Sequence, residues 1–317
     1  MRGCEPRTGA GWLRGPNAGA GEGEDLPGKA ADSRPADTGE VGDGALGTEL
    51  QRRGLPPGEP PERWNWVRPD QVRAVSAAYA GLGVDWLRTN TFGANRPRLA
   101  LHGLEASVER ANREGVRLAR EAGAGRPVAV LGSVGPTGSA AAAEWRAAYQ
   151  EQFEYLAAAG VDGVVVETVV RSAEGRDAVE LAVRQGLGRV LAAYTPGPGG
   201  RLLDGSDPER FARECLEAGA AAVGVNCGAG PESLLGPIAQ LAAVGVGPLY
   251  VAPSAGIPVL SEGVFQYPVG PDGFQKAAIQ FRERGVRILA GCCGAGPGHL
   301  AAVLERFRRP KSGPDGG

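Results

Sequence analysis

Histidine is nearly absent from this chain, which has two among 317 residues, His102 and His299. Histidine is the side chain whose ordinary pKa suits proton transfer near neutral pH. We interpret both as surface or helix-capping residues. The sequence therefore disfavours histidine-dependent acid–base catalysis.

An excess of charge and long apolar runs are also missing. The 34 Lys and Arg nearly balance the 36 Asp and Glu, giving a net charge of −2. A nucleic-acid-binding protein would carry a basic field. No apolar run is long enough for a membrane span, and no segment resembles a signal peptide. We expect a cytoplasmic protein with a small-molecule partner, no nucleic acid and no membrane.

The five cysteines are an odd number, spread over a long chain that lacks a secretory segment. This pattern argues against a disulfide framework and for free or metal-bound thiols in a reducing compartment. Cys4 lies in a segment without apolar periodicity, and Cys215 lies in an amphipathic helical pattern. Neither is expected to carry chemistry.

Composition divides the chain into three parts. Residues 1–40 are rich in glycine, proline and polar residues and are predicted to be a disordered low-complexity tail. Residues 310–317 are expected to be a frayed C-terminus. The remaining 41–309 form the predicted folded domain.

Within 41–309, continuous apolar runs alternate with amphipathic segments in eight units. The runs are apolar throughout, as in parallel strands covered by helices on both faces. Eight units at about 30-residue spacing predict a single α/β domain, a (β/α)8 TIM-type barrel. The first strand is weakly encoded, because only Val41 is apolar before Asp43. The expected helices lie near 69–81, 105–123, 142–159, 173–186, 207–219, 231–243, 272–285 and 297–309.

In such a barrel the carboxyl ends of all strands face one mouth, where barrel enzymes place their active sites. No lysine is among the residues at these ends, which disfavours a barrel aldolase or isomerase with a lysine at its mouth. The polar residues expected there are Asp43, Thr89, Asn90, Thr91, Ser133, Glu167, Thr168, Tyr194, Asn226, Cys227, Ser254, Cys292 and Cys293.

Three of these residues are cysteines. Cys292 and Cys293 are adjacent, and taken alone they fit a metal site or simple packing equally well. Cys227 ends a strand two positions away in the barrel, so three thiols are expected to converge. Three cysteines with an open fourth position are typical of a catalytic zinc site. Zinc with three thiolates carries a formal charge of −1, which suits activation of a fourth thiol for alkyl transfer. Buried structural thiols are the alternative.

Asp43 and Glu167 are carboxylates that follow apolar residues at the mouth. A buried carboxylate is costly unless a cation or hydrogen-bond donors meet it. The cation expected is a substrate ammonium group, and the alternative is an arginine such as Arg88 or Arg171.

Several motifs, in order from Val41 to Arg309, resemble the homocysteine S-methyltransferase family: "DGALGTEL", "TNTFGANRPRL", "GSVGPTG", "VET", "GVNCGAGPESLL" and "AGCCGAGPGHL". The pattern is most similar to the homocysteine-binding module of cobalamin-dependent methionine synthases. Two positions depart from it, because Ser254 replaces an asparagine in "PSAG" and Arg171 replaces an acid in "ETVVR".

The resemblance implies zinc-dependent methyl transfer to the thiol of homocysteine, giving methionine. It implies that Cys227, Cys292 and Cys293 bind Zn²⁺ and that Asp43 and Glu167 receive the substrate ammonium. Thr89 and the backbone amides of the "GALGT" turn, Gly44 included, are expected near the substrate carboxylate. Asn226 completes the expected substrate-binding set.

The methyl donor stays open. The sequence contains no corrinoid-binding Asp-x-His-x-x-Gly motif and no second barrel. We therefore expect methylcobalamin on a separate corrinoid protein as the donor. The alternatives are S-methylmethionine, S-adenosylmethionine, or a homocysteine-binding subunit that has lost catalysis.

Overall fold

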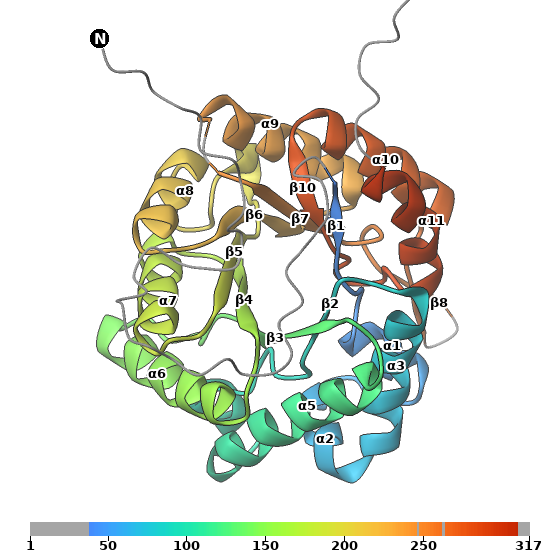
Figure 1. The fold of residues 1–317 in the computed structure, drawn as a ribbon. Coiled ribbons are helices and arrows are strands. Elements are labelled where there is room, and N and C mark those ends of the chain that lie inside the picture. The colour runs from blue at the N-terminus through green and yellow to red at the C-terminus, as the bar shows by residue number, and fades with distance from the viewer. Residues whose placement is uncertain (1–37, 246, 262–263, 310–317) are drawn as a thin grey trace, which may run out of the picture.

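A computed structural model describes residues 38–245, 247–261 and 264–309 of the chain (Figure 1). The predicted tail, apart from residues 38–40, and the predicted frayed end lie outside the described residues.

Eight parallel strands form one sheet in the order β1-β10-β7-β6-β5-β4-β3-β2. A parallel bridge between Gly42 and Trp86 joins the two edges, so the sheet closes into a barrel. The predicted (β/α)8 fold is confirmed. The strands are β1 (Glu40–Val41), β2 (Trp86–Arg88), β3 (Ala129–Val134), β4 (Gly163–Val169), β5 (Arg189–Tyr194), β6 (Ala222–Cys227), β7 (Leu249–Pro253) and β10 (Val286–Leu289).

Eight long helices surround this barrel, one after each strand (Figure 1). Every helix expected from the sequence is present, with ends that agree to within a few residues. The helices are α3 (Pro69–Leu82), α5 (Val108–Gly123), α6 (Ala142–Ala158), α7 (Ser172–Arg184), α8 (Pro208–Glu217), α9 (Leu235–Ala243), α10 (Pro271–Glu283) and α11 (Pro297–Arg308).

The weakly encoded first strand is real but has only two residues. Glu40 pairs with Ile288 and Val41 with Leu289 on β10. On its other side, the Val41 N–H donates to the Asp85 carboxylate at 2.7 Å, and the Asp85 N–H donates to the Val41 carbonyl at 2.7 Å. A side chain thus supplies a hydrogen bond that the short strand could not obtain from a longer ladder.

Alternate strand residues point into the barrel or outward to the helices, as the two-residue period of a strand requires. The inward set includes Trp86, Leu131, Val165, Leu191, Tyr250 and Ile288, which form one buried cluster. Arg88 lies two residues after Trp86 and shares its inward direction, so a charged side chain sits directly above an apolar barrel core.

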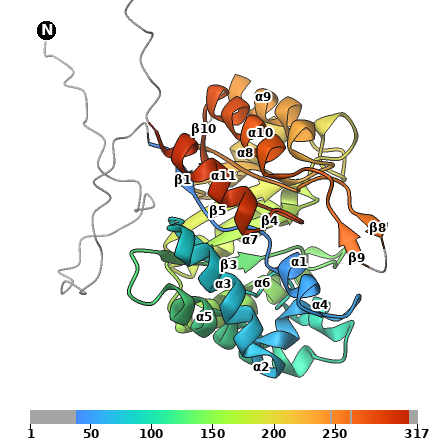
Figure 2. The same ribbon diagram turned by 90° about the vertical axis from the view of Figure 1, so that its right-hand side faces the viewer.

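Shorter elements gather at the carboxyl ends of the strands. They are α1 (Gly47–Arg52), α2 (Trp64–Val67), α4 (Arg96–Ala100) and the antiparallel hairpin β8 (Val259–Ser261) and β9 (Val264–Gln266). Figure 2 shows the hairpin projecting from the body of the barrel. Of the helices in the described part of the chain, none has the length and apolar character needed to cross a membrane.

Candidate active site

The three cysteines predicted to converge do so. Their sulfur atoms all lie within 4.8 Å of one another. Cys227 Sγ is 2.8 Å from Cys292 Sγ, and Cys292 Sγ is 4.0 Å from Cys293 Sγ. All three are free thiols, with Cys293 exposed and the other two half-buried. The cluster therefore faces the mouth.

Backbone hydrogen bonds fix the two segments that carry the thiols. The Ser254 N–H donates to the Cys227 carbonyl at 3.0 Å, and the Cys292 N–H donates to the Pro253 carbonyl at 2.9 Å. The Ala255 N–H donates to the Cys293 carbonyl at 2.8 Å. The end of β7 thus lies between the two cysteine-bearing segments and joins them.

Asn226 lies against the sulfur cluster and is fully buried. Its Nδ2 lies 3.8 Å from Cys227 Sγ and 3.9 Å from Cys292 Sγ. The same amide donates to Thr168 Oγ1 at 2.8 Å, and its Oδ1 accepts the Thr168 N–H at 2.8 Å. The structure thus places this predicted substrate-binding residue between the thiols and β4.

Mutual hydrogen bonds and burial shift the pKa values of the thiols. The hydrogen bond with Cys292 lowers the pKa of Cys227, but Cys293 and burial outweigh it and raise that pKa to about 12. For Cys293, the hydrogen bond with Cys227 lowers the pKa, but the one with Cys292, its charge and burial raise it to about 12. A thiol must lose its proton to bind a metal. Metal binding and deprotonation are therefore coupled here.

The cluster fits a zinc ion by its donor chemistry. Three sulfurs are a zinc donor set, and tetrahedral ligands about 2.3 Å from zinc lie about 3.8 Å from one another. The Cys292–Cys293 sulfur separation of 4.0 Å is close to that value. The Cys227–Cys292 separation of 2.8 Å is shorter, so that pair must open by roughly 1 Å to accept the ion.

Across the mouth, Arg88 joins both predicted carboxylates. Its Nε donates to Asp43 Oδ1 at 2.8 Å, and its backbone N–H donates to Asp43 Oδ2 at 2.8 Å. Its Nη1 donates to Glu167 Oε2 at 2.7 Å. Of the two arginines considered from the sequence, Arg171 instead bonds the Ser139 carbonyl and Glu174.

Burial and neighbouring charges shift the pKa values of this group in opposite directions. Burial raises the pKa of Asp43, and the Arg88 charge offsets part of that rise. Burial lowers the pKa of Arg88, but Glu167 and Asp43 outweigh it and raise that pKa well above its usual value. The guanidinium therefore stays charged. Asp43 is 0% exposed and Glu167 is 4% exposed.

Thr89 and Gly44 lie in this half of the mouth. Thr89 Oγ1 accepts the Ser133 N–H at 3.1 Å and contacts Thr91 Oγ1 at 2.6 Å. Ser133 Oγ donates to Glu167 Oε1 at 2.6 Å. The Gly44 carbonyl accepts from Arg88 Nη2 at 2.9 Å. A Cβ at Gly44 would lie 2.1 Å from the Ala295 carbonyl oxygen, which explains why glycine occupies this position.

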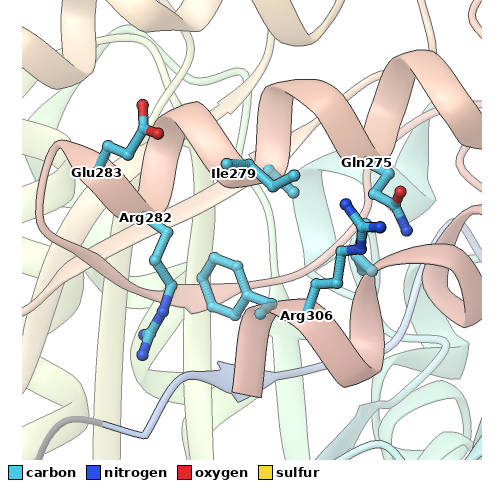
Figure 3. Close-up of a pocket in the computed structure, with 8 residues that line it drawn as sticks. Gln275, Ile279, Arg282, Glu283 and Arg306 are labelled. Atoms are coloured by element: carbon cyan, nitrogen blue, oxygen red, sulfur yellow. The ribbon is translucent and has the colours of Figure 1, made fainter. Parts of the chain in front are cut away.

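Other candidates have structural roles. His299 Nδ1 accepts the Gly296 N–H at 3.2 Å at the start of α11, and His102 is exposed, as predicted. Cys215 is buried in α8, also as predicted. A cavity of about 310 Å³ lies between α10 and α11 and is lined by Gln275, Ala278, Ile279, Arg282, Glu283, Val303, Arg306 and Phe307 (Figure 3). None of the predicted site residues lines it.

Sequence reasoning underestimates two residues. It gives Arg88 only as one possible partner of the carboxylates, although its spacing from Trp86 indicates an inward direction. It does not single out Tyr267, which packs on Gly294, where a Cβ would lie 2.1 Å from Tyr267 Cγ. No sequence motif indicates this second contact.

Residues 40–307 match the homocysteine S-methyltransferase family. The chain belongs to this family. It is 32% identical to a methionine synthase of Mycobacterium tuberculosis, over 86% of the chain and 25% of that protein. It is 30% identical to a methionine synthase of Mycobacterium leprae, over 86% of the chain and 24% of that protein. The chain thus spans about a quarter of the length of these relatives.

Solved structures share the fold of this chain. The metallated form of the Escherichia coli homocysteine methyltransferase MmuM superposes with a TM-score of 0.73 and is 25% identical, with 85% of this chain and 96% of that chain covered. A carboxyl transferase domain of Rhizobium etli pyruvate carboxylase has a TM-score of 0.55 and 14% identity, over 87% of this chain and 46% of that one. That likeness shows the barrel fold alone.

Proposed function

We propose that this protein transfers a methyl group to the thiol of homocysteine and so makes methionine, with zinc bound by Cys227, Cys292 and Cys293. The observation that carries the proposal is the meeting of these three thiols within 4.8 Å at the barrel mouth. The family membership and the named activities of the relatives support it.

Zinc, when bound, would hold the substrate sulfur as a nucleophilic thiolate at neutral pH. The protein's own residues hold the three sulfurs on two rigid segments, and Asn226 orients Cys227 and Cys292 through its amide. In the reaction a carbon–sulfur bond forms, the bond from the methyl group to its donor breaks, and the thiol proton is released.

Glu167 and Asp43 supply the acidic side of the mouth. Their two negative charges exceed the single positive charge of Arg88, so this group carries a net charge of −1. A substrate ammonium would balance it. The "GALGT" turn and Thr89 lie in the same half of the mouth, where the substrate carboxylate is expected.

The exposed apolar residues favour a methyl donor carried by a protein. Four of the nine large hydrophobic residues exposed in the described part of the chain lie together on the β8–β9 hairpin and the residues leading into it: Ile257, Val259, Leu260 and Phe265. Clustered exposed apolar residues are typical of a docking surface. We therefore propose methylcobalamin on a corrinoid protein as the donor. S-methylmethionine and S-adenosylmethionine are the alternatives, and a homocysteine-binding subunit without catalysis is another.

The test measures bound zinc and homocysteine-dependent methionine formation with methylcobalamin, S-methylmethionine and S-adenosylmethionine as donors. Cys293→Ala should lose zinc and activity together. Cys215→Ala is the matched control, because it removes a buried thiol in α8, away from the cluster. A Cys293→Ala variant that keeps full zinc and activity would refute the proposal. Tight homocysteine binding without turnover on any donor would favour the binding subunit.

A further inference from the structure

We propose that Arg88 is a positioning residue for substrate recognition. It binds both carboxylate oxygens of Asp43 and holds Glu167 as the one carboxylate that contacts the substrate ammonium. This inference rests on the proposed function and assigns separate roles to two carboxylates that the sequence treats as equivalent.

Asp43 has no exposed side that a substrate could reach. One of its oxygens accepts from Arg88 Nε and the other from the Arg88 backbone N–H, each at 2.8 Å. The side chain is 0% exposed. Its contacts therefore make it the residue that orients the guanidinium, and it reaches the substrate only through Arg88.

Glu167 is held at both oxygens but faces the mouth. Arg88 Nη1 donates to Oε2 at 2.7 Å, and Ser133 Oγ donates to Oε1 at 2.6 Å. A carboxylate has about four acceptor positions. Two stay open on Glu167, on a side chain that is 5% exposed. Those positions suit an ammonium group that enters from the mouth.

The formal charges of this group leave room for one further cation. Asp43 and Glu167 together carry −2 and Arg88 carries +1, which leaves −1 in a buried group. The aromatic neighbours add no charge, because the Arg88 guanidinium lies 6.0 Å from the Trp86 ring centroid and the raised pKa of Tyr250, caused first by burial, keeps that phenol neutral. One cationic group from a substrate completes the balance.

Arg88 also connects this group to the thiol cluster. Its Nη2 donates to the Gly291 carbonyl at 2.6 Å and to the Gly44 carbonyl at 2.9 Å. Gly291 directly precedes Cys292. The guanidinium thus fixes the position of Glu167 relative to the segment that carries two of the three thiols. A lysine could not make these bonds at once, because its ammonium lacks the planar fork of arginine.

The experiment compares two ligands on the zinc-loaded full chain by calorimetry: homocysteine and 4-mercaptobutanoate, which lacks the amino group. Charged hydrogen bonds of this kind correspond to a preference of roughly 10- to 100-fold for homocysteine in the wild type. We expect Arg88→Lys to reduce that preference at least about tenfold while 4-mercaptobutanoate binding and zinc stoichiometry stay unchanged. Arg171→Met, which removes a positive charge elsewhere at the rim, should keep the preference.

A double variant, Arg88→Met with Asp43→Asn, separates position from charge. It leaves Glu167 as a single negative charge, so the net charge stays −1 and only one buried charge has to be accommodated. We expect its preference for homocysteine to remain reduced, because Glu167 then keeps only the Ser133 hydrogen bond and loses the one from Arg88. Recovery of the wild-type preference would show that Arg88 only balances charge and would overturn the proposal. An equal loss for both ligands in Arg88→Lys would also overturn it.

Binding measurements on the wild-type protein distinguish a failure of this inference from a failure of the proposed function. If the wild-type protein shows no zinc-dependent homocysteine binding, the proposed function fails and this inference fails with it. If the wild type prefers homocysteine and Arg88→Lys prefers it equally, only the role of Arg88 is refuted.

Discussion

Thr168 and Cys227 share an unusual backbone conformation, with φ angles of 62° and 64°. They are the two non-glycine residues in the described part of the chain with positive φ. Such conformations cost about 1–3 kcal/mol for ordinary residues and concentrate at functional sites. Asn226 bonds both atoms of Thr168 that face it and lies against the Cys227 sulfur. This single amide therefore stabilises two strained residues at the thiol cluster.

Replacing Asn226 should weaken zinc binding. Asn226→Ala removes the contacts to the Cys227 and Cys292 sulfurs, and loss of such supporting contacts typically costs about 10- to 100-fold in metal affinity. Competition with a chromogenic chelator measures the change. Thr195→Val is the matched control, because Thr195 Oγ1 donates only to the Asn226 carbonyl, at 2.9 Å. Equal zinc affinity in Asn226→Ala and wild type would show that the amide does not support the cluster.

Gly294 is constrained by its conformation and by Tyr267. Its φ is 77°, and a Cβ there would lie 2.1 Å from Tyr267 Cγ. Gly160 has a φ of 79°, and a Cβ there would meet no atom within 4 Å, so it isolates the conformational cost. We expect Gly160→Ala to lose about 1 kcal/mol of unfolding free energy and Gly294→Ala to lose about 2 kcal/mol more through the clash. Urea denaturation measures both. Similar losses in the two variants would show that Tyr267 moves aside freely.

The sequence predicts most of the barrel because the strands are buried on both faces. The apolar run "RVLAAY" corresponds to β5 residue for residue. The convergence of the thiols was also predictable, since β6 and β10 flank β7. Knowing the topology was enough to bring Cys227 beside Cys292, although the residues are 65 positions apart.

The first strand and Arg88 were harder to predict, for different physical reasons. The first strand has only two residues, and a hydrogen bond from Val41 to the Asp85 side chain helps to hold it. Its sequence therefore lacks the apolar run that marks the longer strands. Arg88 binds the carboxylates of Asp43, which follows β1, and of Glu167 in β4, and such a pairing depends on three-dimensional distances. Local sequence shows only that a charge follows an apolar run.

Glu62 should make stability depend on pH. It is 3% exposed, and burial raises its pKa in the folded protein above the usual value. Its favourable contribution is full below the unfolded pKa of about 4.3 and is lost as the pH rises through the raised folded pKa. Glu62→Gln does not titrate and can still accept the Gly93 N–H. We therefore expect the stability of Glu62→Gln relative to wild type to increase from pH 4 to pH 7 in urea denaturation. Glu154→Gln, at an exposed position, should show little such change.

Asp85 and Asp162 make the same contact in two successive parts of the barrel. Asp85 Oδ2 accepts the Val41 N–H at 2.7 Å, and Asp162 Oδ2 accepts the Val130 N–H at 2.7 Å. Each also bonds an arginine, Arg308 or Arg120. The two aspartates differ in what they support, because β1 has two residues and β3 has six.

Replacing Asp85 should therefore disturb its strand more than replacing Asp162. Each alanine variant leaves one backbone N–H without its partner, at a cost of about 1–3 kcal/mol. In Asp162→Ala the longer ladder of β3 should hold Val130 in place. In Asp85→Ala we expect β1 to open locally, with amide hydrogen exchange at Val41 and Gly42 at least about tenfold faster than in wild type. Equal protection at these amides in both variants would mean that pairing with β10 alone holds the first strand, and that Asp85 is dispensable for placing Asp43.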